Sequence, residues 1–438
     1  MSDRKSVIIE MRDRDTFDRA KNGELPGETL DLDHAFDTVE IPSDHDGAGD
    51  DGTTHLARGE VHHEDIDELE DHPEVLGVWS DGKIGLFGTG APAADTKNAS
   101  DLPLPPKPWV TDFNKAFGDL ADVAAAVGAD ELWAQGIDGH GVTVADVGGG
   151  MTAVGRPIAG ADKKSAQWPM AQIPHVTGGW PENWGTTSVA MNWHGNVMAT
   201  GILGLAPNAE IFDIRIVEDG GSGHGVKGMI SDALKAYKWA IDSFKATGKP
   251  NILNNSWGLY TQASAPNYAT HPDHPFTRKV ELAIDTGMVV LFSAGNCGMC
   301  GAAPGCDPDI GPGQDIWGAN GAPAVMTIAG ATSEGAYIGY SAQGPAALDK
   351  QKPDFCSLTQ YQGYNACDYG TSSACCTASG IAALLKCACP DATHADIKAA
   401  LQKTAAQIGD GPWNYGSGSG IVRVPEAVAH LKANMGTH

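Results

Sequence analysis

This chain of 438 residues has little positive charge, and it shows neither a long apolar run nor an apolar leader at its start. There are 29 Lys and Arg against 55 Asp and Glu, and the net charge of −26 argues against nucleic acid or an anionic membrane surface as a partner. No apolar run reaches the roughly 18 residues that a membrane helix needs. The first ten residues lack the apolar core of a secretory signal, so we expect a cytoplasmic protein, with export by another route left open.

What is present indicates a folded protein with an acidic front end. Apolar residues make up 42% of the chain, and its 11 Trp are typical of a globular, well-buried molecule. Residues 1–100 carry 25 Asp and Glu and 9 Lys and Arg, a balance of −16, which leaves −10 for the rest. The nine cysteines are an odd number, and we expect mainly reduced thiols, with internal disulfides left open.

The pattern along the chain predicts two folded regions. Residues 1–88 mix short strands and helices in a small α+β domain, and residues 89–110 form a linker rich in Pro, Gly and Ala. In residues 111–438 apolar strands alternate with helices, which predicts an α/β domain with a mostly parallel sheet flanked by helices. The expected strands are 142–147, 210–217, 251–254, 288–293 and 325–329. The expected helices are 196–203, 228–247, 277–286 and 374–386.

Four polar residues stand at strand ends or helix starts in this second region. Asp146 is followed by three glycines, His194 and Ser372 precede apolar helical stretches, and Asn296 closes a strand. The carboxyl edge of an open α/β sheet is where ligands bind. A hydroxyl, an imidazole, a carboxylate and an amide together suffice for acyl transfer with a stabilised oxyanion. Each residue alone has an ordinary structural explanation, such as a turn or a helix cap.

The segments around these residues resemble the subtilisin-like serine proteases (subtilases), in the order Asp, His, Asn, Ser. The resemblance covers roughly residues 125–435. Its motifs are His-Gly-Asn-Val-Met-Ala-Thr at 194–200, Gly-Leu-Ala-Pro at 204–207, Asn-Asn-Ser-Trp-Gly at 254–258, Ser-Ala-Gly-Asn at 293–296, Tyr-Ser-Ala-Gln-Gly-Pro at 340–345 and Gly-Thr-Ser at 370–372.

The resemblance implies a serine endopeptidase that acts on a peptide or protein substrate. Its catalytic residues would be Asp146, His194 and Ser372, and Asn296 would stabilise the oxyanion. The residues that line the substrate would be Ser256, Trp257, Gly258 and Gly295. No cofactor is required and no metal ligand is assigned. The family admits calcium, but the spacing of Asp307, Asp309 and Asp315 does not locate a site.

The acid of this set depends on how the strand is aligned with the family. Counting from Gly141 places Gly148 at the acid's position and leaves no carboxylate. Counting from Gly139 places Asp146 there, and we prefer this register because it keeps both a carboxylate and the glycine turn. Cys376 stands where the family has Pro after the nucleophile, without removing a group that carries a proton.

The acidic front end resembles the subtilase inhibitor-like propeptide, through residues 61–81. The resemblance implies that the propeptide assists folding, lies through the active site and is cut off by the enzyme itself. Phe87 would then be the P1 residue and Ile84 the P4 residue, which predicts a preference for large apolar P1 side chains.

Other interpretations stay open at this point. The domain could be an inactive subtilase fold that binds peptides or a partner, or a peptide ligase or macrocyclase, which only Cys376 suggests. The propeptide could also stay attached as an inhibitor. Cys297, Cys300 and Cys306 have part of a zinc-site spacing, although free thiols or a local disulfide fit them better.

Overall fold

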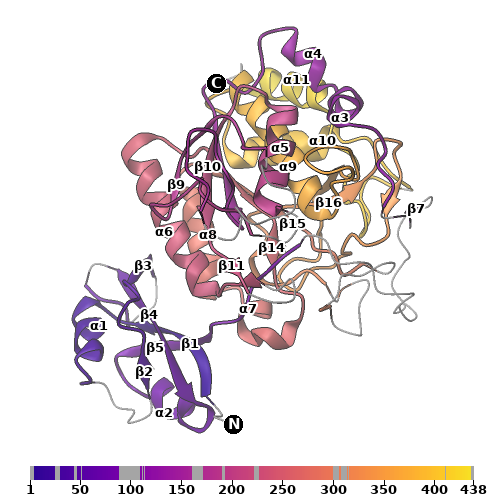
Figure 1. The fold of residues 1–438 in the computed structure, drawn as a ribbon. Helices are drawn as coiled ribbons and strands as arrows, with labels where there is room; N and C mark the ends of the chain where they lie inside the picture. The colour runs from indigo at the N-terminus through magenta and orange to yellow at the C-terminus, as the bar shows by residue number, and fades with distance from the viewer. Residues whose placement is uncertain are drawn as a thin grey trace.

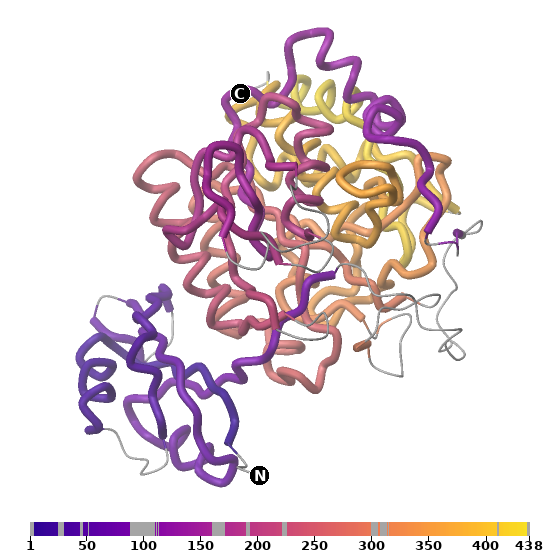
Figure 2. The backbone as a smooth tube through the Cα atoms, viewed as in Figure 1, coloured from indigo at the N-terminus to yellow at the C-terminus, as the bar shows by residue number. Residues whose placement is uncertain are grey.

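The computed structural model describes residues 4–24, 30–43, 47–50, 52–87, 109–110, 112, 114–159, 171–189, 193–220, 226–298, 305–306, 313, 315–409 and 411–435. These residues form a small N-terminal unit and a larger unit beside it (Figure 1). The chain passes from one to the other as a single extended segment after residue 80 (Figure 2).

The N-terminal unit is a five-stranded antiparallel sheet with two helices. The sheet order is β2-β4-β1-β5, with β3 beside β4. Its elements are β1 (Arg4–Met11), α1 (Arg14–Lys21), β2 (Asp31–Leu32), β3 (Val39–Pro42), β4 (Thr53–His62), α2 (Ile66–Glu70) and β5 (Val75–Ser80). Side chains alternate along β1, so Val7 and Ile9 pack under the two helices, whereas Ile8 points to the opposite face.

The larger unit is built on a sheet that has nine strands among the described residues, nearly all of them parallel. The order is β7-β17-β16-β15-β13-β8-β10-β9, with β18 beside β16. These strands are β7 (Trp109–Val110), β8 (Thr143–Gly148), β9 (Val176–Trp180), β10 (Glu210–Arg215), β13 (Ile252–Asn255), β15 (Val289–Ser293), β16 (Met326–Ala331), β17 (Tyr337–Ile338) and β18 (Phe355–Leu358). Four two-residue strands of the described residues lie outside both sheets, namely β6 (Gly85–Leu86), β11 (Glu218–Asp219), β12 (Val226–Lys227) and β14 (Trp257–Gly258).

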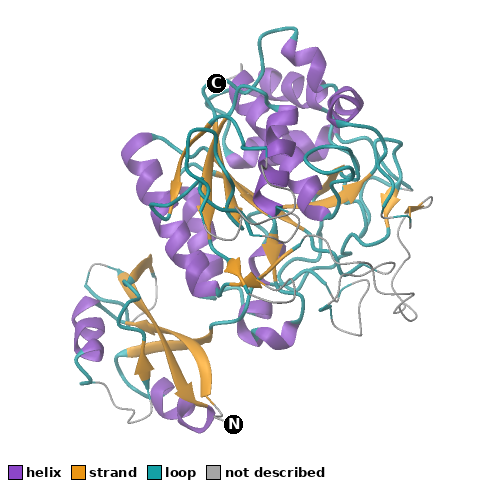
Figure 3. Cartoon of the chain, in the orientation of Figure 1, coloured by secondary structure: helices purple, strands orange, loops and turns teal. Residues whose placement is uncertain are grey.

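Helices cover both faces of this sheet (Figure 3). On one face are α3 (Leu120–Val127), α4 (Ala129–Trp133), α5 (His194–Leu205), α9 (Thr371–Ala388), α10 (His394–Thr404) and α11 (Val424–Met435). On the other are α6 (Ile230–Thr247), α7 (Pro266–Thr270) and α8 (Pro275–Asp285). The central strands are buried on both sides, as expected for strands that read as continuous apolar runs. The predicted α/β class is confirmed.

The two units share an apolar interface. Phe36 and Leu56, on the outer face of the small sheet, belong to the same buried cluster as Tyr237 of α6 and Phe276 of α8. The N–H and hydroxyl of Ser231, in the first turn of α6, donate to the Asp81 carboxylate over 2.9 and 2.7 Å. The small unit therefore covers two helices of the larger one and caps one of them.

Two regions differ from expectation. The last two residues of the predicted linker form β7, which pairs with β17, and residues 89–108 lie outside the described part of the chain. Both α5 and α9 begin earlier than predicted, so His194 and Ser372 lie in first turns of helices rather than before them. No described helix is both long and apolar enough to cross a membrane.

Candidate active site

Residues 83–87 lie as an extended strand between two segments of the larger unit. Within them β6 (Gly85–Leu86) pairs antiparallel with β14, and the Phe87 N–H donates to the Ser256 carbonyl over 3.1 Å. On the other side the Ile84 N–H donates to the Gly228 carbonyl over 3.0 Å. An extended peptide adds to a sheet edge through such main-chain bonds. The chain thus places its own residues where a peptide would bind.

The Phe87 carbonyl lies between a hydroxyl and an amide. Its oxygen accepts hydrogen bonds from Ser372 Oγ over 2.6 Å and from Asn296 Nδ2 over 2.8 Å. Ser372 lies in the first turn of α9, where backbone N–H groups have no partner inside the helix and the dipole favours negative charge. A negative charge that develops on this carbonyl oxygen would be met by a preorganised donor.

The Asn296 amide is held in one orientation by Thr371. Both the N–H and Oγ1 of Thr371 donate to Asn296 Oδ1, over 2.9 and 2.8 Å, which leaves Nδ2 free to donate to Phe87. The Gly295 N–H in turn donates to Thr371 Oγ1 over 3.1 Å. Position 370 requires glycine, because its φ is +91° and a Cβ there would come within 2.8 Å of the Phe87 oxygen. The turn before α9 is therefore shaped around this carbonyl.

His194 contacts the Ser372 hydroxyl from the first turn of α5. The distance from His194 Nε2 to Ser372 Oγ is 3.2 Å, within reach for proton transfer. A side chain on Gly195 would collide with the Gly150 carbonyl, so glycine here lets the helix approach the end of β8. Burial lowers the pKa of His194 to about 4, which keeps the imidazole neutral and able to act as a base.

Asp146 is fully buried inside β8. Asn254 Nδ2 donates to Asp146 Oδ1 over 2.8 Å, and Ser379 Oγ fixes the Asn254 amide by donating to its Oδ1 over 2.9 Å. Burial raises the pKa of Asp146 to about 8, the Asn254 hydrogen bond opposes this, and the Asp213 carboxyl on the neighbouring strand adds to it.

The position of Asp146 differs from the strand-end position expected from the sequence. The strand continues through Val147 and ends at Gly148, so Asp146 lies two residues before its end. The structure has no hydrogen bond between Asp146 and His194: Asp146 Oδ2 and His194 Nδ1 both lack a partner among the described residues. The role of Asp146 as the acid stays a prediction.

The Phe87 ring fills a pocket built from two glycines and a tyrosine. A Cβ on Gly258 would come within 2.7 Å of the ring, and one on Gly295 within 3.5 Å. Tyr260 meets the ring edge to face at 5.3 Å between centroids, and its hydroxyl donates to the Leu86 carbonyl over 2.5 Å. The pocket has room for an aromatic ring because the glycines at positions 258 and 295 have no side chain.

Ser256 and Trp257, also predicted to line the substrate, contribute mainly through the backbone. Ser256 accepts from the Phe87 N–H through its carbonyl, and Trp257 pairs with Leu86 in the short β14–β6 ladder. The Trp257 ring is buried in the core instead, where it donates to Asn255 Oδ1 over 3.2 Å.

Sequence reasoning missed two residues of this site. Thr371 lies inside the Gly-Thr-Ser motif, where it was taken only as part of the turn, and Tyr260 lies two residues beyond the Asn-Asn-Ser-Trp-Gly motif. The signal for Thr371 was its side-chain hydroxyl next to Ser372, whereas nothing local distinguishes Tyr260.

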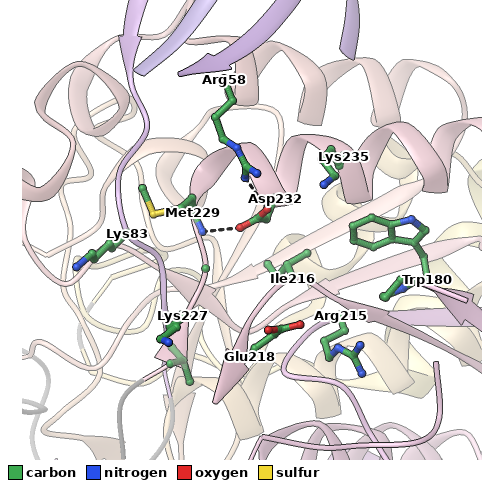
Figure 4. A pocket seen from close by; sticks show the side chains of 13 residues that line it. Arg58, Lys83, Trp180, Arg215, Ile216, Glu218, Lys227, Met229, Asp232 and Lys235 are labelled. Carbon is green, nitrogen blue, oxygen red and sulfur yellow. Dashed lines mark hydrogen bonds and ion pairs between the residues drawn. The ribbon is translucent and has the colours of Figure 1, made fainter. Parts of the chain in front are cut away.

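A cavity of about 680 Å³ lies where the N-terminal unit, the 83–87 segment and α6 meet (Figure 4). Arg58 of the N-terminal unit reaches across it to Asp232 of α6, with 3.0 Å between Arg58 Nη1 and Asp232 Oδ1. Cations dominate the lining although the chain is acidic: Arg58, Lys83, Arg215, Lys227 and Lys235, against Glu218 and Asp232.

Among the residues that the structure describes, no cysteines come together as a metal centre at this site. Cys297 and Cys306 form a disulfide beside Asn296, and Cys300 lies outside the described residues, as do Asp307 and Asp309. Within the described part of the chain, one group of possible metal ligands comes together, Asp138, His140 and Cys387. Cys387 is near the C-terminal end of α9, whereas Ser372 is in its first turn, so this group belongs to a different part of the fold.

Comparison with known proteins agrees with this geometry. The model of the subtilase family matches residues 134–420. The chain is 26% identical over 223 residues to a thermostable alkaline protease of Halalkalibacterium halodurans, across 50% of this chain and 51% of that protein. It is 26% identical over 416 residues to bacillopeptidase F of Bacillus subtilis, across 85% of this chain and 25% of that protein. Subtilisin DY of Bacillus licheniformis is 26% identical over 310 residues, across 68% and 95% of the two chains.

A solved structure shares the fold. Fervidolysin from Fervidobacterium pennivorans, described as a keratinolytic enzyme related to subtilisin, superposes with a TM-score of 0.60 at 18% identity, covering 97% of this chain and 61% of that one. The chain spans about half the length of the alkaline protease and a quarter of bacillopeptidase F.

The fold and the match together define the class: this is a serine-type endopeptidase scaffold. The chain belongs to the subtilase family. The predicted family is confirmed, and the enzymes of this family are serine-type endopeptidases that act on peptides or proteins. Subtilases commonly bind calcium, which nothing locates in the described residues, and their catalysis requires no cofactor.

The expected cytoplasmic location is wrong. Subtilisin E and bacillopeptidase F, both relatives of this chain, are extracellular enzymes. The Cys297–Cys306 disulfide agrees with this correction, because disulfides persist in oxidising compartments. The net charge and the N-terminal residues could not reveal this.

Proposed function

We propose that this chain hydrolyses peptide bonds with Ser372 as nucleophile, His194 as general base and Asp146 as the supporting acid. One observation carries the proposal: the Phe87 carbonyl oxygen accepts from both Ser372 Oγ and Asn296 Nδ2. A peptide carbonyl thus lies against a hydroxyl that also contacts an imidazole, with an amide aimed at its oxygen.

The proposed reaction follows from these contacts. Ser372 Oγ attacks the carbonyl carbon while its proton passes to His194 Nε2, and the Asn296 amide and the first N–H groups of α9 stabilise the oxyanion. The His194 imidazolium then gives the proton to the leaving amine. Water repeats the sequence on the acyl-enzyme and releases the acid.

We propose further that the first peptide bond cut is the chain's own, after Phe87. The N-terminal unit would act as a propeptide that covers α6 and α8 and threads its last residues through the site. The Phe87 pocket favours large apolar P1 side chains. The Ile84 side chain is buried in the same cluster as Ile216 and Val217, which favours an aliphatic P4 residue.

The test compares Ser372→Ala with Ser373→Ala on a peptide substrate with Phe at P1 and an amine leaving group after it. Ser373 is the matched control because its hydroxyl donates to the Tyr369 carbonyl, away from the Phe87 oxygen. We expect Ser372→Ala to lower kcat by at least about 10⁴-fold and to abolish labelling by a fluorophosphonate. Ser373→Ala should stay within a few-fold of wild type. Near-wild-type hydrolysis by Ser372→Ala would remove the mechanism.

A catalytically inactive, peptide-binding subtilase is the second candidate, because Asp146 and His194 have no direct hydrogen bond. It predicts no fluorophosphonate labelling of the wild-type chain and tight binding of Phe-ending peptides. The ligase alternative depended on Cys376, whose Sγ lies inside the core beside the Tyr361 hydroxyl, at 3.4 Å.

A further inference from the structure

Two buried polar atoms of the proposed catalytic residues have no partner among the described residues. They are Asp146 Oδ2, on a side chain that is 1% exposed, and His194 Nδ1, on one that is 3% exposed. Buried polar atoms are nearly always hydrogen-bonded, because leaving one unpaired destabilises the folded protein. One of them is on the imidazole that contacts the Ser372 hydroxyl, and the other is on the carboxylate proposed to support that imidazole, which points to a shared function.

Strand periodicity puts Asp146 on the helix face that carries His194. Val144 of β8 packs in the core under α5 and α9, whereas Ala145 and Val147 pack on the α6 and α8 side. Side chains alternate with a period of two, so Asp146 and Gly148 share the face of Val144. Asp146 therefore points toward the layer that holds His194 and Ser372.

Gly148 leaves open the space between this carboxylate and the end of the strand. A Cβ on Gly148 would lie 3.6 Å from Asp146 Oδ2 and 3.8 Å from the nearest Leu86 methyl, both ordinary contact distances. The backbone of Gly148 is outside the left-handed region, so any residue could adopt it. Two residues on, the Gly150 carbonyl touches Gly195, which is next to His194.

We propose that Asp146 is a positioning residue that acts on His194 indirectly, across the space that a side chain at position 148 would fill. A water molecule seated there would accept from His194 Nδ1–H and donate to Asp146 Oδ2, satisfying both atoms. No proton is transferred to Asp146: His194 takes one proton from Ser372, and the relayed hydrogen bonds hold the tautomer and stabilise the imidazolium. This rests on the proposed function and adds how its acid works.

The charges around Asp146 give this relay a pH dependence. Asp213 faces it from β10 with Arg215 two residues on, and the neutral thiols of Cys375 and Cys376 face it from α9. Burial holds the pKa of Asp146 near 8. The carboxylate therefore gains its charge, and its effect on His194, as pH rises through about 8.

The test measures kcat and KM from pH 6 to 10 on the full chain, incubated until its activity is constant. We expect Asp146→Asn to lower kcat by about 10–100-fold with KM nearly unchanged, less than the ~10⁴-fold cost of losing a carboxylate that contacts the base. The wild-type kcat should rise as the pH passes through about 8, and Asp146→Asn should remove this rise in kcat. Adding Gly148→Asp to Asp146→Asn should restore kcat at least 10-fold, because a carboxylate then reaches His194 without a relay.

Asp213→Asn is the matched control, an equally buried carboxylate on the neighbouring strand. Asp213→Asn should keep kcat within about threefold of wild type. It should also move the rise in kcat to lower pH, because losing a nearby like charge lowers the pKa of Asp146. The inference fails if Asp146→Asn matches wild type at every pH while Ser372→Ala is inactive, or if Asp213→Asn causes the larger loss. Should Asp146→Asn not fold, Gly148→Asp alone decides: a pH profile identical to wild type contradicts the relay.

An active Ser372→Ala would instead refute the proposed function itself, whatever Asp146 does. The two failures are therefore distinguishable.

Discussion

Removing the Thr371 hydroxyl should slow catalysis through Asn296, without touching the substrate. Thr371 Oγ1 donates to Asn296 Oδ1 over 2.8 Å and accepts from the Gly295 N–H over 3.1 Å. In Thr371→Val the Thr371 N–H still holds Oδ1 at 2.9 Å, so the amide loses one of its two anchors. A hydrogen bond of this kind contributes about 1 kcal/mol, and the unpaired Gly295 N–H adds to the loss.

We therefore expect Thr371→Val to lower kcat by about 5–30-fold, equivalent to about 1–2 kcal/mol of transition-state stabilisation. KM should change less than about twofold, because the backbone contacts of the substrate remain. Thr371→Ser keeps the hydroxyl and should behave as wild type. Asn296→Ala alone should cost roughly 10²–10³-fold.

The double variant gives the sharpest reading. If Thr371 acts only by orienting the Asn296 amide, Thr371→Val should cost almost nothing further once Asn296 is alanine. Steady-state kinetics on one peptide substrate with Phe at P1 supply all four rates. Equal costs of Thr371→Val with and without Asn296, or no cost at all, would refute this reasoning.

Two other predictions concern the pocket and the interface. Gly258→Ala should lower kcat/KM for a Phe P1 peptide at least 10-fold and spare an Ala P1 peptide, because the new methyl would meet the ring at 2.7 Å; equal effects on both peptides would refute the pocket. Burial between the units raises the pKa of Asp81 to about 6, so its favourable contribution to binding is present below its free pKa and lost as pH rises through 6. We therefore compare the affinities of two fragments of residues 1–87, wild type and Asp81→Asn, for the processed enzyme by titration calorimetry. The ratio of the wild-type affinity to the Asp81→Asn affinity should fall by up to about 100-fold between pH 4 and 7. A ratio that stays constant with pH would contradict this.

The fold was largely predictable because its central strands read as apolar runs. Strands β13, β15 and β16 lie within two residues of their predicted bounds, since both faces of each strand are buried. In the N-terminal unit β4 is hard to predict from the sequence, because His55, Arg58 and Glu60 interrupt its apolar positions. Only its neighbours β1, β2 and β3 show that it is central.

The sequence predicted which residues come together at the candidate site, but not how they are placed relative to one another. Ser372, His194, Asn296 and Phe87 come together, although 285 positions separate the first from the last. The helix starts were placed too late because Gly195 and Ser373 are weak helix formers, and tertiary contacts override that preference. The place of Asp146 depended on where β8 ends, and a run of glycines does not mark that end.

The most direct test of the central claim is the intact mass of the purified wild-type chain beside Ser372→Ala. If Ser372 attacks the Phe87 carbonyl that it contacts, the wild type should appear as a species that begins at Gly88, and Ser372→Ala should keep its full length. Two full-length proteins, or two shortened ones, would contradict the account.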